Sequence, residues 1–171
     1  MPNPQNKKGL FQFYPHNLVW LSLSIVAIIL DQWTKWIAST SLNYADPVPV
    51  LPFLNWTLLH NYGAAFSFLS DAGGWQRYFF TSLAGLVSVV FVFWLMRMPK
   101  TVKVLPIAIA LILGGAIGNL IDRIWLGFVV DMFDFRGIWQ FVFNFADVCV
   151  VVGGILLIIL IFRDKEILEK I

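Results

Sequence analysis

The sequence predicts an integral membrane protein that is mainly α-helical, with four transmembrane helices, a small extracytoplasmic β-sheet and one short outer helix. Composition is the first reason. Hydrophobic residues make up 59% of the 171-residue chain, charged residues only 13%, and the mean hydropathy is +0.78. Soluble domains carry roughly 25% charged residues, so this chain cannot form a water-facing surface of the usual kind. The other two reasons are four long apolar stretches and two aromatic links of strand-like composition.

The four apolar stretches lie at about residues 18–37, 78–96, 104–121 and 146–162. Roughly 20 apolar residues span a bilayer, and helix is the expected state because an open strand would leave backbone groups unpaired in lipid. The first stretch ends in "DQWTKW" rather than in a small-x-small cleavage site, so we expect a retained span and not a signal peptide. We treat residues 1–171 as one membrane-embedded domain.

Lysine and arginine are distributed unevenly between the links. They occur at residues 7 and 8, in the link "RMPKTVK" between the second and third spans, and after the fourth span. Residues 38–76 contain none, and residues 122–145 contain only Arg123 and Arg136. Short cytoplasmic loops carry the excess of these residues in membrane proteins. The sequence therefore predicts that both termini are cytoplasmic and that the links 38–76 and 122–145 lie outside.

The two outer links are apolar and aromatic. "VPVLPFLNWTLLH" and "FVVDMFDFRGIWQFVFNF" have strand-like composition broken by proline and by an Arg-Gly turn. We expect a small sheet on the outer leaflet, with Trp and Phe at the interface. Between these segments, "NYGAAFSFLSDAGGW" predicts a short amphipathic helix that ends at Gly73 and Gly74.

Ionisable residues gather at the outer ends of the spans. Asp31 lies about 13 residues into the first span, roughly 20 Å along a helix. Asp122 and Arg123 close the third span, Asp147 opens the fourth, and Asp131 lies in the link between them. An Asp at the centre of a membrane helix costs about 3 kcal/mol on insertion scales, so such residues usually face protein or water and have a function.

Structural roles compete with chemical ones at several of these positions. Asp31 and Lys35 are four residues apart and can pair on one helix face, or they can contact a substrate. Asp122 and Arg123 can anchor a helix end among lipid headgroups. The glycines of "GGAIG" allow another helix to approach closely, which needs no chemistry.

Asp131 and Asp147 are the candidate catalytic pair. Two nearby carboxylates share a proton, which suits aspartic-protease chemistry. Proton- or ion-coupled transport uses the same residue type, and the pattern alone leaves the two equally open. The lone cysteine excludes an internal disulfide, the two histidines have no ligand-spaced partners, and a net charge of +2 gives no argument for nucleic acid. We expect no metal and no cofactor.

Five ordered sequence blocks decide between these alternatives. They are "DQWTK" from Asp31, "NYGAAFSF" from Asn61, "GGAIGNLIDR" from Gly114, "VVDMFDF" from Val129 and "FNFADV" from Phe143. In this order and spacing the chain resembles the lipoprotein signal peptidase family, bacterial signal peptidase II, over nearly its whole length. The resemblance implies an aspartic endopeptidase of the bacterial cytoplasmic (inner) membrane. Such enzymes remove the signal peptide from prolipoproteins by cutting on the amino side of a diacylglyceryl-modified cysteine.

The resemblance also implies roles for individual residues. Asp131 and Asp147 would be the catalytic dyad, near the periplasmic face, and the outer helix would be periplasmic. Supporting and substrate-binding positions would be Asp31, Lys35, Asn61, Gly63, Asn119, Asp122, Arg123 and Asn144. Expected partners are diacylglyceryl-modified prolipoproteins, membrane lipid and globomycin-like cyclic peptide inhibitors, and we expect a monomer. A cover over the site would include residues 61–69. A non-catalytic lipoprotein scaffold remains the alternative that binds substrate without cutting it.

Overall fold

Four long helices form the membrane part of the chain. The computed structural model describes residues 13–63, 73–98 and 103–163, and within these ranges the helices are α1 (Leu18–Ser41), α2 (Trp75–Arg97), α3 (Val104–Trp125) and α4 (Phe145–Arg163). A short 3₁₀ turn, η2 (Pro15–Asn17), precedes α1. All four helices are long and apolar enough to cross a membrane. They extend past the predicted spans, most clearly at the C-terminal ends of α1 and α3, and in α3 the polar residue at the predicted end, Asp122, is buried and paired with Lys35.

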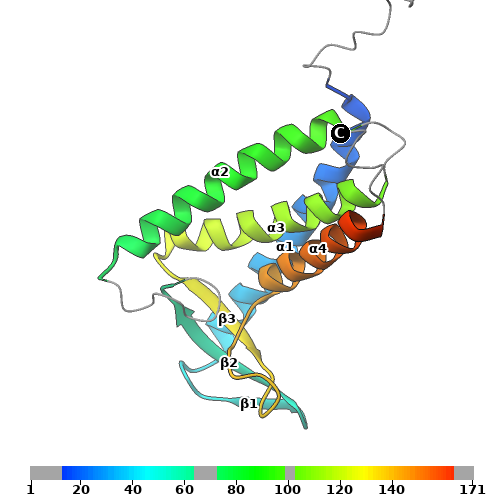
Figure 1. The fold of residues 1–171 in the computed structure, drawn as a ribbon. Coiled ribbons are helices and arrows are strands. Elements are labelled where there is room, and N and C mark those ends of the chain that lie inside the picture. Colours follow the sequence, from blue (N-terminus) through cyan, green and yellow to red (C-terminus); the bar gives the residue numbers. More distant parts are fainter. Residues whose placement is uncertain (1–12, 64–72, 99–102, 164–171) are drawn as a thin grey trace, which may run out of the picture.

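Helix α3 is the centre of the bundle and packs against α1, α2 and α4 (Figure 1). Its glycines make this packing possible. A Cβ at Gly118 would lie 2.5 Å from Oδ2 of Asp31 in α1, and one at Gly115 would collide with the carbonyl oxygen of Ala146 in α4. The close-packing interpretation of "GGAIG" is therefore confirmed, and it places α3 beside the polar residues of both neighbours.

A three-stranded antiparallel sheet lies at one end of the bundle, opposite η2 and the end of α4 (Figure 1). Its order is β1 (Val48–Leu51), β2 (Leu54–Asn61) and β3 (Val129–Asp134). Leu59 of β2 faces Asp131 of β3 in the register. The predicted small sheet is thus present. Most of the predicted short helix, residues 64–72, lies outside the described residues.

One face of the sheet packs on the end of α1. Leu58, Val130 and Met132 are buried there together with Ala38. Successive side chains of a strand point to opposite faces, so Asp131, between Val130 and Met132, points away from this cluster. Hydrophobic burial on one side of β3 therefore turns Asp131 toward the ends of α3 and α4.

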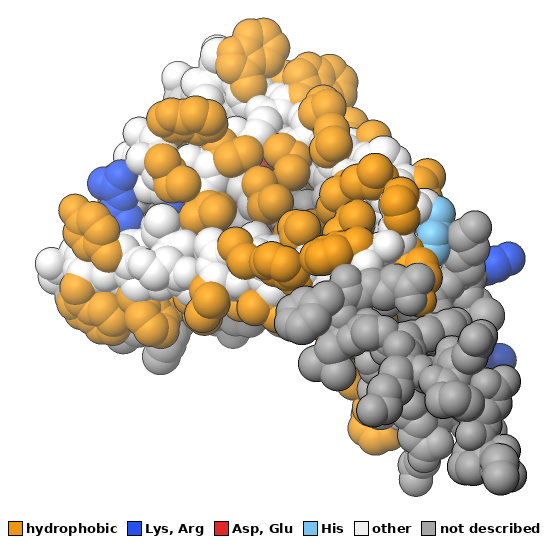
Figure 2. Space-filling model, turned by 90° about the horizontal axis from the view of Figure 1, so that it is seen from above, with side chains coloured by type: hydrophobic (Ala, Val, Ile, Leu, Met, Phe, Trp, Pro, Cys, Tyr) orange, Lys and Arg blue, Asp and Glu red, His pale blue; other side chains and the backbone are white. Residues whose placement is uncertain are grey.

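Much of the helix surface is hydrophobic. Large apolar side chains are exposed on every helix, for example Ile29, Leu86, Ile124 and Ile155. In the described part of the face shown in Figure 2, hydrophobic side chains are spread widely and Lys and Arg lie toward the edges. Exposed apolar patches of this extent mark a surface that contacts lipid rather than water. The chain is a multi-pass membrane protein.

Candidate functional site

Two carboxylates, from β3 and from the start of α4, are held by the same asparagine. Asn144 donates from Nδ2 to Oδ1 of Asp131 at 2.7 Å, and its backbone N–H donates to Oδ2 of Asp147 at 3.2 Å. Asn144 is fully buried and Asp131 is 3% exposed, while Asp147 is half-buried. The structure therefore brings together the two residues that the sequence suggested as a pair, and one of them is only half-buried.

Local sequence explains the placement of Asp147. Asn144 immediately precedes α4, and its Oδ1 accepts the backbone N–H of Asp147 at 2.9 Å. The carboxylate of Asp147 accepts the backbone N–H of Asn144 in return. This reciprocal pair is a capping box, which satisfies two free donors at a helix start. Asp147 is thus fixed in the first turn of α4, where the helix dipole favours negative charge.

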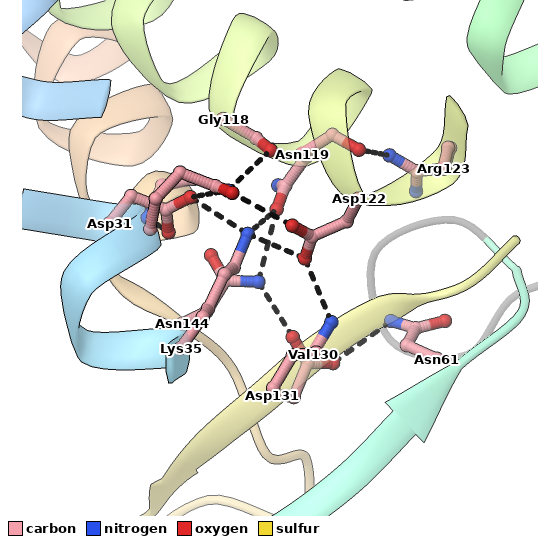
Figure 3. A network of polar contacts seen from close by, with 12 residues as sticks. Asp31, Lys35, Asn61, Gly118, Asn119, Asp122, Arg123, Val130, Asp131 and Asn144 are labelled. Carbon is pink, nitrogen blue, oxygen red and sulfur yellow. Dashed lines mark hydrogen bonds and ion pairs between the residues drawn. The ribbon is translucent and has the colours of Figure 1, made fainter. Parts of the chain in front are cut away.

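Asn119 of α3 connects this pair to a buried cation (Figure 3). Its Nδ2 donates to Oδ1 of Asp147 at 2.8 Å, and its Oδ1 accepts from Nζ of Lys35 at 2.9 Å and from Nδ2 of Asn144 at 3.1 Å. One side of the amide thus accepts from two donors while the other donates to Asp147. Its orientation is fully determined by these contacts.

Lys35 of α1 also pairs with two carboxylates, one in its own helix and one in α3. Its Nζ lies 2.8 Å from Oδ2 of Asp31 and 3.0 Å from Oδ2 of Asp122, and all three side chains are at most 4% exposed. The predicted pairing of Asp31 with Lys35 is confirmed. Asp31 in addition accepts the backbone N–H of Ala146 at 2.9 Å. Full burial makes the headgroup-anchor interpretation of Asp122 wrong, and it leaves Asp31 without access to a substrate.

Asp122 also fixes the strand that carries Asp131. Its Oδ2 accepts the backbone N–H of Val130 at 3.0 Å, so the end of α3 and β3 are held together one residue before Asp131. Strand β2 adds a second contact from the other side, since Nδ2 of Asn61 donates to Oδ2 of Asp131 at 3.1 Å. Asp131 therefore has two amide donors and no contacting cation among those the structure describes around it.

Arg123 connects the end of α3 to the segment just after β2. Its guanidinium donates to the carbonyl oxygens of Gly63 at 3.0 Å and of Asn119 at 3.3 Å. The backbone N–H of Gly63 donates to Oδ1 of Asn61 at 3.0 Å, which orients the amide that contacts Asp131. All ten sequence-predicted site residues thus lie in one connected network of polar contacts. The cover that residues 61–69 were expected to form falls largely outside the described residues.

The electrostatic environment of Asp131 favours the protonated acid. Burial and the neighbouring Asp147 raise the pKa of Asp131 to about 7, although the Asn144 and Asn61 amides oppose this rise. A carboxyl group with a pKa near neutrality can hold a proton for acid catalysis. A partly open carboxylate at a helix start beside it can serve as a base. The arrangement suits acid–base hydrolysis without a covalent intermediate.

Sequence reasoning missed two polar residues of this region. Nε2 of Gln32 donates to Asp122 at 2.9 Å, to the Gly118 carbonyl at 3.2 Å and to Asp31 at 3.2 Å. Nε of Arg77 donates to the carbonyl oxygen of Arg123 at 2.9 Å. Both carried a signal in the sequence. Gln32 lies inside the "DQWTK" block, and Arg77 is a cation at the span end that the charge bias predicts to be poor in cations.

The chain is similar to known proteins in sequence and in structure. A family model described as signal peptidase (SPase) II matches residues 23–163. A lipoprotein signal peptidase of Acinetobacter baumannii (strain ATCC 17978) is 75% identical over 99% of this chain and 96% of its own length. One from Escherichia coli O6:K15:H31 is 49% identical, covering 83% of this chain and 88% of its own. A bacterial membrane enzyme solved by the in meso method at 2.3 Å resolution is similar in structure, with a TM-score of 0.80 at 31% identity over 92% of this chain and 94% of its own.

Proposed function

Since the chain belongs to the signal peptidase II family, we propose that Asp131 and Asp147 are the catalytic dyad with which it removes signal peptides from prolipoproteins. The observation that carries the assignment is the shared contact of both carboxylates with Asn144. Of the carboxylates in the network, Asp31 and Asp122 are each paired with Lys35, which leaves Asp131 and Asp147 for chemistry.

The dyad is asymmetric. We assign Asp147, which lies in the first turn of α4 and accepts from Asn119 at 2.8 Å, as the base. Asp131, with its pKa near 7, holds the shared proton. Asp147 takes a proton from water, the water oxygen attacks the scissile carbonyl carbon, and Asp131 donates its proton to the carbonyl oxygen. As the tetrahedral intermediate collapses and the C–N bond breaks, Asp147 gives the proton taken from water to the leaving nitrogen. Asp131 takes back a proton from a hydroxyl of the intermediate, so both carboxyl groups return to their starting states.

The proposed substrate is a prolipoprotein cut on the amino side of a diacylglyceryl-modified cysteine. The acyl chains and signal-peptide helix of such a substrate lie in the bilayer, and its scissile bond lies at the bilayer boundary. The dyad sits at the end of the four apolar helices where the sheet begins, which is the depth that this bond requires (Figure 1). The Lys and Arg bias supports cytoplasmic termini and a dyad near the periplasmic face.

The other residues of the network are positioning residues. Asn144, Asn119 and Asn61 hold the dyad, while Lys35, Asp31 and Asp122 join α1, α3 and β3 beneath it. Arg123 with Gly63 connects the segment just after β2 to α3. Membrane lipid and globomycin-like cyclic peptides are the further proposed partners, and one chain supplies the complete set of residues, in keeping with a monomer.

The test is cleavage of diacylglyceryl-modified prolipoprotein by purified variants. Asp131→Asn and Asp147→Asn should each abolish turnover, because each removes one half of the proton exchange. Asp134→Asn is the matched control, since Asp134 lies on the same strand but accepts from Asn55 and Thr57 outside the dyad. Normal cleavage by either dyad variant would refute the assignment. Substrate that binds the unmodified protein but stays uncut would favour a scaffold, and Asp131-dependent proton flux in liposomes without cleavage would favour a transporter.

A further inference from the structure

Arg77 binds the end of the helix that carries much of the site. It lies in the first turn of α2, and its guanidinium donates from Nε to the carbonyl oxygen of Arg123 at 2.9 Å and from Nη2 to that of Ile124 at 3.1 Å. Both acceptors belong to the last turn of α3. A residue at the start of one span therefore caps the end of the next.

The capped carbonyls would otherwise lack donors. The last four carbonyls of a helix have no partner within it. In α3 the carbonyl oxygen of Asp122 accepts from the N–H groups of Leu126 and Gly127, and the next two carbonyls accept from Arg77. Arginine suits this task because its planar fork presents several donors in fixed directions and its charge complements the helix dipole.

Gly127 leaves room for this guanidinium because it has no side chain. Its φ is +88°, a conformation that favours glycine, and a Cβ there would lie 3.0 Å from Nη1 of Arg77. The turn from α3 into the segment before β3 thus closes directly over the arginine. The contact is built from three places in the chain: the start of α2, the last turn of α3 and the turn after it.

The same turn of α3 leads to the dyad. Arg123, whose carbonyl Arg77 holds, donates from its side chain to Gly63 at 3.0 Å and lies over the Phe80 ring of α2 with Cζ 5.7 Å from the centroid. Gly63 orients Asn61, and Asn61 donates to Asp131 at 3.1 Å. Contacts therefore run without a break from Arg77 to the carboxyl that we assign as the acid.

We infer that Arg77 is a positioning residue for the peptidase reaction, acting through Arg123, Gly63 and Asn61 on Asp131. The inference rests on the proposed dyad. Arg77 itself touches neither carboxylate, so its role differs from that of the asparagines that contact them. The opposing interpretation is that Arg77 is a helix cap that affects stability alone, and the two differ in the pH dependence of cleavage.

The experiment compares Arg77→Met, Arg77→Lys and the matched control Arg136→Met, an exposed arginine of the same outer region. Each purified full-length protein is tested for thermal unfolding and for cleavage of diacylglyceryl-modified prolipoprotein across pH. Arg77→Met should lower kcat by roughly 10- to 100-fold, as expected for a small misplacement of reacting groups, with KM changed less than about twofold. The alkaline limb of kcat/KM should move to higher pH, because the Asn61 donor that favours ionised Asp131 is loosened.

Arg77→Lys should shift the limb in the same direction by less, because lysine keeps the charge but cannot serve both carbonyls in the same geometry. It also provides the measurement if Arg77→Met does not fold. Arg136→Met should match the unmodified protein in all readouts. If Asp131→Asn is inactive while the Arg77 variants keep the kcat and pH limb of the unmodified protein and lose only thermal stability, the inference fails and the dyad stands. Full activity of Asp131→Asn would instead remove the proposed function itself.

Discussion

Replacing Asn144 with alanine should move the alkaline limb of the pH–rate profile to higher pH. In the unmodified protein, Asp131 loses the shared proton as the pH rises through about 7, and kcat/KM should fall above that value. The Asn144 amide, which donates to Oδ1 of Asp131 at 2.7 Å, stabilises the ionised form. Without this donor the proton is held to higher pH, so the fall in rate should begin later.

The size of the shift follows from the strength of this hydrogen bond. A hydrogen bond to a charged group contributes about 1.5–3 kcal/mol, and one pKa unit corresponds to about 1.4 kcal/mol. Loss of the bond alone would raise the pKa of Asp131 by about one to two units. Asn61 still donates to the other oxygen of Asp131, so we expect a shift of about one unit. The maximal rate should also drop, because Asp147 loses its capping partner.

The assay is kcat/KM for diacylglyceryl-modified prolipoprotein, measured on purified protein from about pH 5 to about pH 10. Asn55→Ala is the matched control. Asn55 is also a buried asparagine of the outer region that donates to a carboxylate of β3, but its acceptor is Asp134, at 3.2 Å. A limb that stays in place or moves to lower pH in Asn144→Ala would refute the reasoning. So would an equal shift in Asn55→Ala, since the effect would then not depend on contact with the dyad.

Two further predictions concern the packing beneath the dyad. Lys35→Met should destabilise the fold by about 3–5 kcal/mol, because it leaves Asp31 and Asp122 buried without their cation; a melting temperature equal to that of the unmodified protein would contradict this. Gly118→Ala should cost about 1–3 kcal/mol, because its Cβ would lie 2.5 Å from the carboxylate of Asp31, which is held on two sides. Gly154→Ala, whose Cβ meets nothing within 4 Å, is the control and should unfold no earlier than the unmodified protein.

The spans and the sheet follow from patterns that sequence carries locally. Apolar length predicted the four helices, and strand-like composition with proline predicted the outer sheet. Helix ends were less accurate, because hydropathy treats Asp122 as the end of a span. In the structure that residue is buried against Lys35 and Val130, and the helix continues to Trp125.

The site was predictable as a set of residues but not as a set of contacts. The ordered motifs supplied the residue set, and helical spacing gave the Asp31–Lys35 pair. The separation of roles between Asp122 and Asp131 depends on which residue Lys35 reaches, which is a long-range contact between α1 and α3. Arg77 was missed because its partners are backbone carbonyl oxygens. Every residue has such a carbonyl, so no residue type in the sequence indicates the contact.

The division between charged and neutral partners explains how two kinds of carboxylate coexist in one network. Lys35 lies within 3.0 Å of both Asp31 and Asp122, and we propose a structural role for these two residues. The direct side-chain donors to Asp131 and Asp147 are asparagine amides, from Asn61, Asn119 and Asn144. An amide fixes a carboxylate in place without supplying a full positive charge, whereas a contacting ammonium would strongly favour ionisation. If Lys35 contacted Asp131 directly, that carboxyl group would lose its proton well below neutral pH. Asn119 instead lies between Lys35 and Asp147. Its amide fixes the position of the Asp147 carboxylate and keeps the Lys35 ammonium out of direct contact with it.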